Sequence, residues 1–309
     1  MTQEITMGSL FSGSGGFELA GSIFGIRPIW ASEIEPFPIL VTTKNFPEMK
    51  HLGDINKLNG ADLEPVTIIA GGSPCQDMSI AGKREGLDGS RSNLFREQIR
   101  IIKEMRESDR AAGRTGTQIR PRYMVWENVP GAFSSNKGKD FQAVLQEIVS
   151  ITDEESNTLT AADRHGVACF AQQAIGEYEE SEKASCLKRR DYKDSTDLIL
   201  WEYIIRRLTP LECCRLQGFP DNWAEELGIP EPTQEDIDHW REVFRTQMEA
   251  MGESKKEKTD NQICKWLKDP ESDSAKYKMW GNGIALPCAM FVIEGIAMIL
   301  SEEDADEQK

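Results

Sequence analysis

The sequence of 309 residues predicts an α/β protein, with a parallel sheet covered by helices on both faces and a second, smaller and irregular region. Three observations lead to this fold class. Over the first 150 residues, short apolar runs alternate with stretches of helical periodicity. A glycine-rich turn joins the first apolar run to the first helix. After about Ile151 the alternation stops and the sequence becomes polar and irregular.

Short apolar runs predict the strands, and runs with apolar residues three or four positions apart predict the helices. The expected strands are 7–11, 26–33, 51–54, 66–72 and 122–128. The expected helices are 17–25, 36–46, 92–107, 141–151, 234–251, 261–267 and 285–300. The helix over 285–300 is too apolar for the surface, so we expect it to dock onto a core built by other elements.

Composition excludes several classes of protein. No stretch approaches the roughly 18–20 apolar residues of a membrane helix, and the first residues lack the pattern of a signal peptide. We therefore expect a cytoplasmic protein with reduced thiols and no membrane association. The seven cysteines include no Cys-x-x-Cys pair and there are only three histidines, so we predict no metal site.

The net charge of −16 argues against nonspecific coating of nucleic acid, although the relevant field is local. Residues 83–122 hold 11 basic and 6 acidic side chains, whereas residues 225–309 hold 10 basic and 20 acidic ones. Residues 302–309 form an acidic tail, which we expect to be a solvated, frayed end.

The turn after the first strand has the composition of a nucleotide-binding loop. Its three glycines are Gly13, Gly15 and Gly16. Such glycines allow a tight turn and a close approach of the backbone to a ligand at a helix N-terminus. Glu18 stands where the dinucleotide fingerprint has its third glycine. Glu33 and Asp54 end the next two strands, where carboxylates can bind a ribose and an adenine amino group. Together these features indicate a nucleoside site.

Two further motifs lie at the carboxyl ends of later strands. Cys75 follows Ser-Pro in a loop rich in glycine, serine and basic residues, where a thiolate is favoured and accessible. We expect the other six cysteines to be buried apolar residues, Cys288 on its apolar helix in particular. Glu127 and Asn128 end an apolar strand, where burial is expected to raise the pKa of Glu127 toward that of a proton donor.

Five motifs, in this order along the chain, resemble the DNA (cytosine-5)-methyltransferase family. LFSGSGGFELA resembles its cofactor loop, GGSPCQDMS its Pro-Cys loop and WENVPG its Glu-Asn-Val motif. Residues 206–221 (RRLTPLECCRLQGFPD) resemble the motif that organises target recognition, and residues 280–287 (WGNGIALP) resemble the closing Gly-Asn motif. The resemblance implies a Rossmann-like sheet that binds S-adenosyl-L-methionine, and transfer of its methyl group to C5 of a cytosine flipped out of DNA.

The resemblance also assigns roles to matching residues. Cys75 would add to C6 of the cytosine, and Glu127, beside Asn128, would contact its N3. The residues that would hold the cofactor are Phe11, Gly13, Gly15, Gly16, Glu33, Ile34, Asp54, Ile55, Pro74, Leu94 and Asn282.

One family motif is missing from the expected place. A Gln-x-Arg-x-Arg strand should lie between Val129 and Arg206, and we find none there. Residues 118–122 (QIRPR) fit the letters but precede Glu127 and contain a proline, so we interpret them as a coincidence. Three functions stay open: a DNA methyltransferase, a tRNA-methylating relative, and an inactive remnant that binds cofactor and DNA.

The expected domains follow from the order of the motifs. Residues 1–151 plus 280–301 would form the catalytic domain, and residues 152–279 the target-recognition domain with a charged helical insertion over about 222–279. The candidate DNA contacts are Arg164, Lys188, Arg189 and Arg190, because basic side chains bind phosphates and arginine reads guanine. The expected partner is double-stranded DNA, bound by a monomer, and a cognate restriction endonuclease is left open as a second partner.

Overall fold

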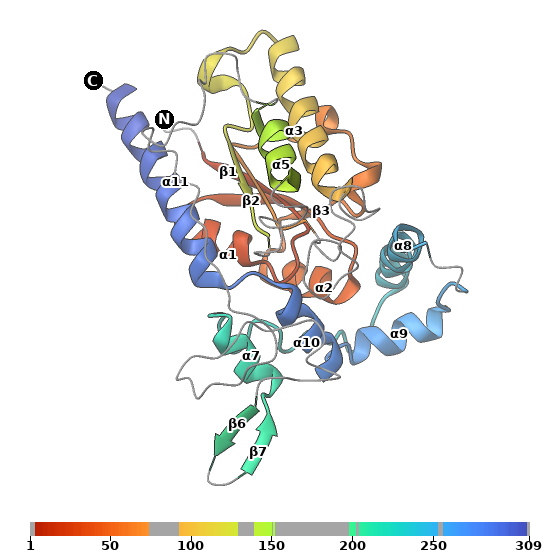
Figure 1. Ribbon diagram of the computed structural model, residues 1–309. Coiled ribbons are helices and arrows are strands. Elements are labelled where there is room, and N and C mark those ends of the chain that lie inside the picture. The colour runs from red at the N-terminus through yellow and green to blue at the C-terminus, as the bar shows by residue number, and fades with distance from the viewer. Residues whose placement is uncertain are drawn as a thin grey trace.

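The computed structural model describes residues 4–73, 93–128, 139–149, 151, 198–201, 204–252 and 256–307. Within these residues, five parallel strands form one sheet in the order β3-β2-β1-β4-β5 (Figure 1). The strands are β1 (Thr6–Leu10), β2 (Arg27–Ser32), β3 (Lys50–His51), β4 (Ile68–Gly71) and β5 (Tyr123–Trp126). The predicted α/β class is confirmed. The third strand is shorter than predicted, so Asp54 lies three residues beyond its end rather than within it.

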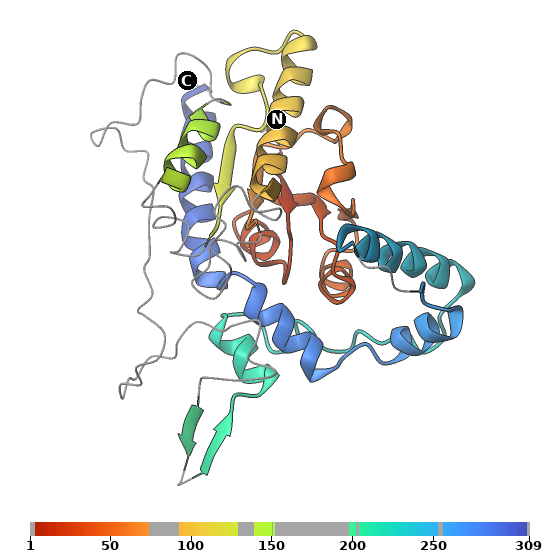
Figure 2. The ribbon, with the colours of Figure 1, turned by 45° about the vertical axis from the view of Figure 1, so that its right-hand side comes forward.

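Helices cover both faces of this sheet. One face carries α1 (Gly16–Ile23), α2 (Pro36–Asn45) and α11 (Leu286–Glu307), and the other carries α3 (Asn93–Ala111) and α5 (Lys139–Val149) (Figures 1 and 2). Strand β4 shows why. Ile68 and Ala70 belong to the apolar cluster of the first face, and Ile69 between them belongs to that of the second. A strand that buries alternate residues on opposite faces must be covered on both sides.

A glycine in β1 makes room for the largest side chain under the sheet. A Cβ on Gly8 would lie 2.2 Å from the ring of Trp30 in the neighbouring strand β2. Trp30 is 2% exposed, and its indole N–H donates to the carbonyl oxygen of Glu64 at 2.8 Å. Because Gly8 has no side chain, the indole of Trp30 can pack directly against the backbone of β1.

The C-terminal part joins this core through two short helices. An antiparallel hairpin of β6 (Leu198–Trp201) and β7 (Ile204–Arg207) leads into α7 (Pro210–Leu216), which packs against α10 (Asp273–Asn282). The buried side chains of this part belong to the same apolar cluster as α1 and α2.

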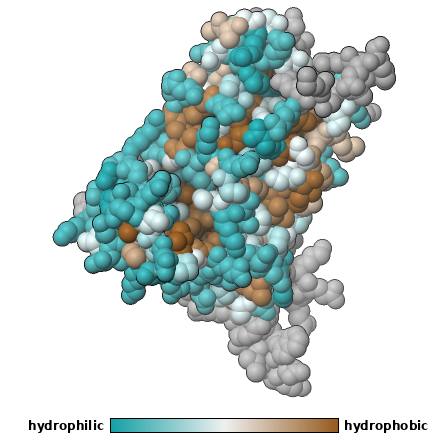
Figure 3. All heavy atoms as spheres, turned by 180° about the vertical axis from the view of Figure 1, so that it is seen from behind, coloured by the Kyte–Doolittle hydropathy of each residue, from teal (hydrophilic) through white to brown (hydrophobic). Residues whose placement is uncertain are grey.

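The charged insertion contains α8 (Gln234–Ala250) and α9 (Asp260–Lys268), which form an arm beside α2 (Figures 1 and 2). Each helix begins with a capping box, at Thr233 and Thr259. Trp240 and Phe244 of α8 pack against Trp266 of α9 at centroid distances of 5.0 Å. Seen from behind, the outer surface of this arm is largely hydrophilic (Figure 3).

The last helix differs from two expectations. It continues through Glu307, so residues 302–307 extend a helix instead of forming a frayed end, and Arg122 holds Glu303 at 2.5 Å. Ala289 and Ile293 are buried, but Phe291 is 63% exposed. Cys288 is exposed too, so the expected burial of this thiol is wrong. A helix that is apolar all round does not reveal which side faces the core.

Residues 118–122 have a structural role of their own. Asp109 is 1% exposed and accepts hydrogen bonds from the amide and Nε of Arg120, at 2.9 and 3.0 Å. Burial alone would raise the pKa of Asp109, but these hydrogen bonds and the charges of Arg120 and Arg114 lower it. Arg120 therefore neutralises a buried acid at the base of the sheet, which supports the interpretation of QIRPR as a coincidental match.

Among the described helices, none alone has the length and apolar composition to cross a membrane. Helix α10 and residues 286–303 of α11 meet that criterion only as a pair, bent by 42°.

The packing of Trp30 makes a prediction about stability. Gly8→Ala places a Cβ against the indole and should lower the free energy of unfolding by about 1–3 kcal/mol. The matched control is Gly295→Ala in α11, where an added Cβ meets nothing within 4 Å and should stabilise the helix slightly. Urea unfolding measures both variants, and equal stability of Gly8→Ala and wild type would contradict this account of the glycine.

Candidate functional site

The glycine loop has a backbone that few residue types can adopt. Phe11, Gly13 and Gly15 have φ angles of 59°, 54° and 80°, in the left-handed region. Phe11 is held there by a hydrogen bond of 2.7 Å from its amide to the carbonyl oxygen of Ser32 in β2. A bulky residue in this region is strained, and such strain is typical of ligand-binding turns. Among the described residues, a Cβ on Gly13 would meet only the carbonyl oxygen of Phe11, at 3.8 Å, so none of them fills this side of the loop.

Glu33 ties the loop to the end of β2. One of its carboxylate oxygens accepts from the amide of Gly13 at 2.8 Å, and the other accepts from the amides of Ile34 and Glu35 at 2.7 and 2.9 Å. Burial raises the pKa of Glu33, although these amide hydrogen bonds oppose the shift. Glu33, which is predicted to bind the ribose, therefore also fixes the glycine loop.

Glu18 lies directly beneath the loop. Its side chain is fully buried, and one carboxylate oxygen accepts from the hydroxyl of Ser12. Burial raises the pKa of Glu18 and outweighs the hydrogen bond from Ser12. The sequence marked Glu18 only as a departure from a glycine pattern. The structure shows an acid at the third position of α1 that reaches back into the loop.

The second predicted acid, Asp54, lies three residues after the end of β3. Asp54 is 8% exposed and caps a short 3-10 turn, accepting from the amide and the side-chain nitrogen of Asn56 at 3.0 and 2.7 Å. Ile55, which follows, is buried in one apolar cluster, and Phe11 and Leu94 pack against that same cluster. Four predicted cofactor residues from three separate segments thus lie at one edge of the sheet.

The C-terminal part completes the loop from the other side. Trp223 donates its indole N–H to the carbonyl oxygen of Ser14 at 2.8 Å, inside the glycine loop. A Cβ on Gly283 would lie 2.5 Å from the hydroxyl oxygen of Ser14. Asn282, just before it, is exposed at the end of α10. The structure therefore brings Asn282 close to the loop, although 266 residues lie between it and Gly15.

Glu127 and Asn128 follow β5, beside the end of β4. A Cβ on Gly72 would lie 2.6 Å from a carboxylate oxygen of Glu127, so this glycine allows the acid to pack there. Burial raises the pKa of Glu127, as predicted. The side-chain amide of Asn128 donates to the hydroxyl of Ser73 at 3.5 Å. Ser73 is the last described residue before Pro74 and Cys75, which lie outside the described residues.

The four candidate DNA contacts, Arg164, Lys188, Arg189 and Arg190, also lie outside the described residues. Sequence reasoning missed the two loop-holding side chains Glu18 and Trp223. Trp223 follows the Phe-Pro-Asp-Asn run, and an aromatic residue there was the only available signal.

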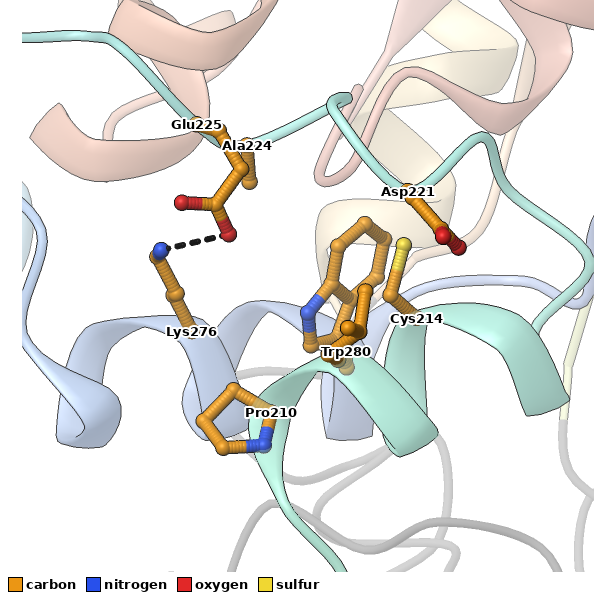
Figure 4. Close-up of a pocket in the computed structure, with 8 residues that line it drawn as sticks. Pro210, Cys214, Asp221, Ala224, Glu225, Lys276 and Trp280 are labelled. Atoms are coloured by element: carbon orange, nitrogen blue, oxygen red, sulfur yellow. Dashed lines mark hydrogen bonds and ion pairs between the residues drawn. The ribbon is translucent and has the colours of Figure 1, made fainter.

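A small pocket lies away from this edge, where α7 meets α10 (Figure 4). Lys276 donates to Glu225 at 2.8 Å on one side of it, and Cys214 lies beside Trp280 on the other. Burial, together with the charges of Asp221 and Glu225, raises the pKa of Cys214 to about 11. This thiol is therefore a structural residue rather than a nucleophile.

The fold is that of an α/β protein with a candidate ligand site at the carboxyl edge of its sheet, and comparison with known proteins gives its family. The family model described as C-5 cytosine-specific DNA methylase matches residues 5–169 and 152–231. These ranges cover more than half of the chain. The chain therefore belongs to the C-5 cytosine-specific DNA methylase family.

The sequence is similar to several curated methyltransferases, over different shares of its length. The Type II methyltransferase M1.ScrFI of Lactococcus lactis subsp. cremoris is 26% identical over 291 residues, covering 72% of this chain and 71% of that protein. The Type II methyltransferase M2.BsuMI of Bacillus subtilis (strain 168) is 37% identical over 131 residues, or 42% of this chain and 31% of that protein. A protein of Escherichia phage P1 named DNA N-6-adenine-methyltransferase is 36% identical over 137 residues, or 43% of this chain and 18% of its own length.

Solved structures share the fold. The Entamoeba histolytica methyltransferase EhMeth superposes with a TM-score of 0.56 at 12% identity, covering 97% of this chain and 99% of that chain. The S. pombe Dnmt2 methyltransferase superposes with a TM-score of 0.52 at 15% identity, covering 96% of this chain and 99% of that chain. At such identities the likeness concerns the fold alone.

The buried carboxyl of Glu127 predicts a pH-dependent stability. Because folding raises its pKa, wild-type protein loses stability from this group as pH rises from its unfolded pKa of roughly 4.3 through the folded value. Glu127→Gln removes that loss. The variant should gain on the order of 1 kcal/mol relative to wild type between pH 4 and pH 8.

Thermal unfolding across this range measures the difference, with Glu302→Gln on the exposed end of α11 as the control for removing an acid. A difference for Glu127→Gln that does not change with pH would contradict the raised pKa.

The hydrogen bond of Trp223 predicts a local effect on the loop. Trp223→Phe leaves the buried Ser14 carbonyl without its indole donor and should cost about 1–3 kcal/mol of stability. Hydrogen–deuterium exchange of the peptide over residues 11–17 should increase. Trp266→Phe removes the same atoms from the insertion and should leave exchange in that peptide unchanged. Equal exchange in both variants would show that Trp223 does not hold the loop.

Proposed function

We propose that the chain transfers a methyl group from S-adenosyl-L-methionine to C5 of a cytosine flipped out of double-stranded DNA, through a covalent bond between Cys75 and C6. One observation carries this proposal. In a chain of the C-5 cytosine-specific DNA methylase family, one edge of a parallel sheet brings together the glycine loop, Glu33, Asp54 and Glu127. The carboxyl edge is where open α/β sheets bind ligands.

The residues at this edge fit the proposed cofactor. No described residue fills the side of Gly13 where a ligand would lie against the loop backbone, and the strained Phe11 is half-buried beside it. Glu33 and Asp54 present carboxylates at two adjacent strand ends, suited to the hydroxyls and the amino group of an adenosine. Ile34, which follows Glu33, is half-buried, and we propose that it packs against the base. When bound, S-adenosyl-L-methionine supplies an electrophilic methyl group.

In the proposed reaction, Cys75 and Glu127 have separate roles. C5 of cytosine is a poor nucleophile, so the thiolate of Cys75 first forms a bond to C6 and breaks the C5–C6 double bond. The electron pair moves into the ring, where a proton or hydrogen bond from Glu127 at N3 stabilises the charge. A carboxyl with a raised pKa suits this role, because it is more readily protonated near neutral pH.

The remaining steps restore the base. C5 acquires the methyl group, a base removes the C5 proton, and the bond between C6 and the Cys75 sulfur breaks to return the thiolate. None of this can occur inside a stacked duplex, so the cytosine must leave the helix.

Double-stranded DNA is thus the proposed partner, bound by a monomer through Arg164, Lys188, Arg189 and Arg190. We also propose that residues 1–151 plus 280–301 form the catalytic domain and that residues 152–279 form the target-recognition domain.

DNA carrying 5-fluorocytosine tests the covalent step. The fluorine cannot leave as a proton does, so the bond from Cys75 to C6 should persist after methyl transfer. Wild-type protein with cofactor should give a DNA-linked band that survives denaturation, and Cys75→Ser should give none. Cys264→Ser, on α9, is the matched control and should form the adduct like wild type.

Two outcomes contradict the proposal. Adduct formation by Cys75→Ser would show that another group is the nucleophile. Absence of C5-methyl product from any DNA with labelled cofactor would exclude the activity on DNA, and the same assay with tRNA then tests the RNA alternative.

A further inference from the structure

The helical insertion carries no motif of the family, yet its helix α8 contacts the core near the candidate site. Helix α8 packs beside α2 and reaches the segments that follow β2 and β3 (Figures 1 and 2). Thr246 lies with its methyl carbon 3.4 Å from where a Cβ on Gly53 would stand. Gln247 donates to Glu35 at 2.8 Å, and Glu249 pairs with Lys57 at 2.5 Å.

These contacted residues flank the acids assigned to the adenosine. Glu35 is two residues after Glu33, and its amide donates to the Glu33 carboxylate at 2.9 Å. Gly53 directly precedes Asp54 and has a φ of 73°. The carbonyl oxygen of Gly53 accepts from the hydroxyl of Ser32 at 2.7 Å, which connects the two strand ends. A helix resting on Glu35 and Gly53 is therefore one residue from Asp54 and two from Glu33.

Glu35 is the centre of these contacts. Besides Gln247, it binds Lys278 of α10 through its other carboxylate oxygen at 2.6 Å. The ammonium group of Lys278 thus neutralises the Glu35 carboxylate, and the side-chain amide of Gln247 helps to orient it. Because the Glu33 carboxylate in turn holds the amide of Gly13, a shift of Glu35 is transmitted to the glycine loop.

Other side chains of α8 assemble the insertion itself. Arg241 pairs with Asp260 at 2.5 Å, and Arg245 pairs with Glu257 at 3.1 Å. These pairs join α8 to α9 and to the segment before it. Some α8 side chains thus assemble the arm, while Thr246, Gln247 and Glu249 contact the segments that follow β2 and β3.

We propose that the insertion is part of the cofactor site: α8 forms an outer wall of its adenosine end, where Thr246 closes against Gly53 and Gln247 positions Glu35 and, through it, Glu33. This inference rests on the proposed function, since it takes the ligand to be an adenosine-containing cofactor. It gives the insertion a role in binding the nucleoside half of the ligand and makes Gln247 a positioning residue.

Calorimetry of the full chain with S-adenosylhomocysteine tests the wall. Gln247→Ala should weaken binding about threefold to tenfold, and Thr246→Arg, which puts a long side chain against Gly53, should weaken it more than tenfold. Adenosine, used as a competitor, should lose affinity by a similar factor, because it contains only the half of the ligand that the wall touches. Arg245→Ala, two residues from Gln247, should bind within about twofold of wild type.

A swap separates positioning from mere stability. Glu35→Gln should weaken binding, and the double variant Glu35→Gln with Gln247→Glu restores an amide–carboxylate pair and keeps a counter-charge for Lys278. It should recover most of the affinity, whatever the change in melting temperature. If Gln247→Ala lowers the melting temperature but binds S-adenosylhomocysteine like wild type, and the swap changes nothing, α8 is only a structural support and the inference is wrong.

The two proposals fail differently. Wild-type protein that binds no S-adenosylhomocysteine overturns the proposed cofactor and the wall together. Wild-type protein that binds it, with weakened binding in Gln247→Ala and no methyl transfer to DNA, sustains the wall and overturns only the reaction.

Discussion

The contact between the Glu33 carboxylate and the amide of Gly13, 2.8 Å long, fixes the glycine loop against the second strand. The hydrogen bond from Phe11 to Ser32 acts beside it, and together they hold the loop although Phe11 is in a strained left-handed conformation. The same carboxylate accepts the amides that begin the turn into α2. Three segments thus share one acid, and the position of the loop, the strand end and the helix all depend on it.

Side chains from the other end of the chain stabilise this arrangement. Trp223 binds the loop carbonyl of Ser14, while Gly283 packs against the Ser14 hydroxyl. The side-chain amide of Gln217 donates to the carbonyl oxygen of Trp280, and the backbone carbonyl of Gln217 accepts from the amide of Leu286, so hydrogen bonds connect α7, α10 and α11 beside the loop. The segment that the resemblance links to target recognition is therefore in direct contact with the loop that the resemblance links to the cofactor.

The sequence predicted the parts of the site that obey a local rule. Glu33, Asp54 and Glu127 were found because polar residues that end parallel strands meet at one edge. The links made by Trp223 and Gln247 had no such signal, since each joins residues about 210 positions apart. Cys288 was misjudged for a related reason. Its helix is apolar on every side, and only the position of α1 decides which side is buried.

Three carboxyl groups at this edge, Glu18, Glu33 and Glu127, have pKa values raised by burial. Their contribution to stability is present below about pH 4.3 and is lost as pH rises through the folded pKa values, so near neutral pH they act against folding. Glu33 is partly compensated by backbone amides, and Glu18 by the hydroxyls of Ser12 and Ser9. Such acids are costly as structural residues. Under the proposed function, Glu127 acts as a protonated donor, whereas Glu18 and Glu33 would face the positive charge of the cofactor as carboxylates. A ligand that brings positive charge to this edge would offset part of the cost of burying these two acids.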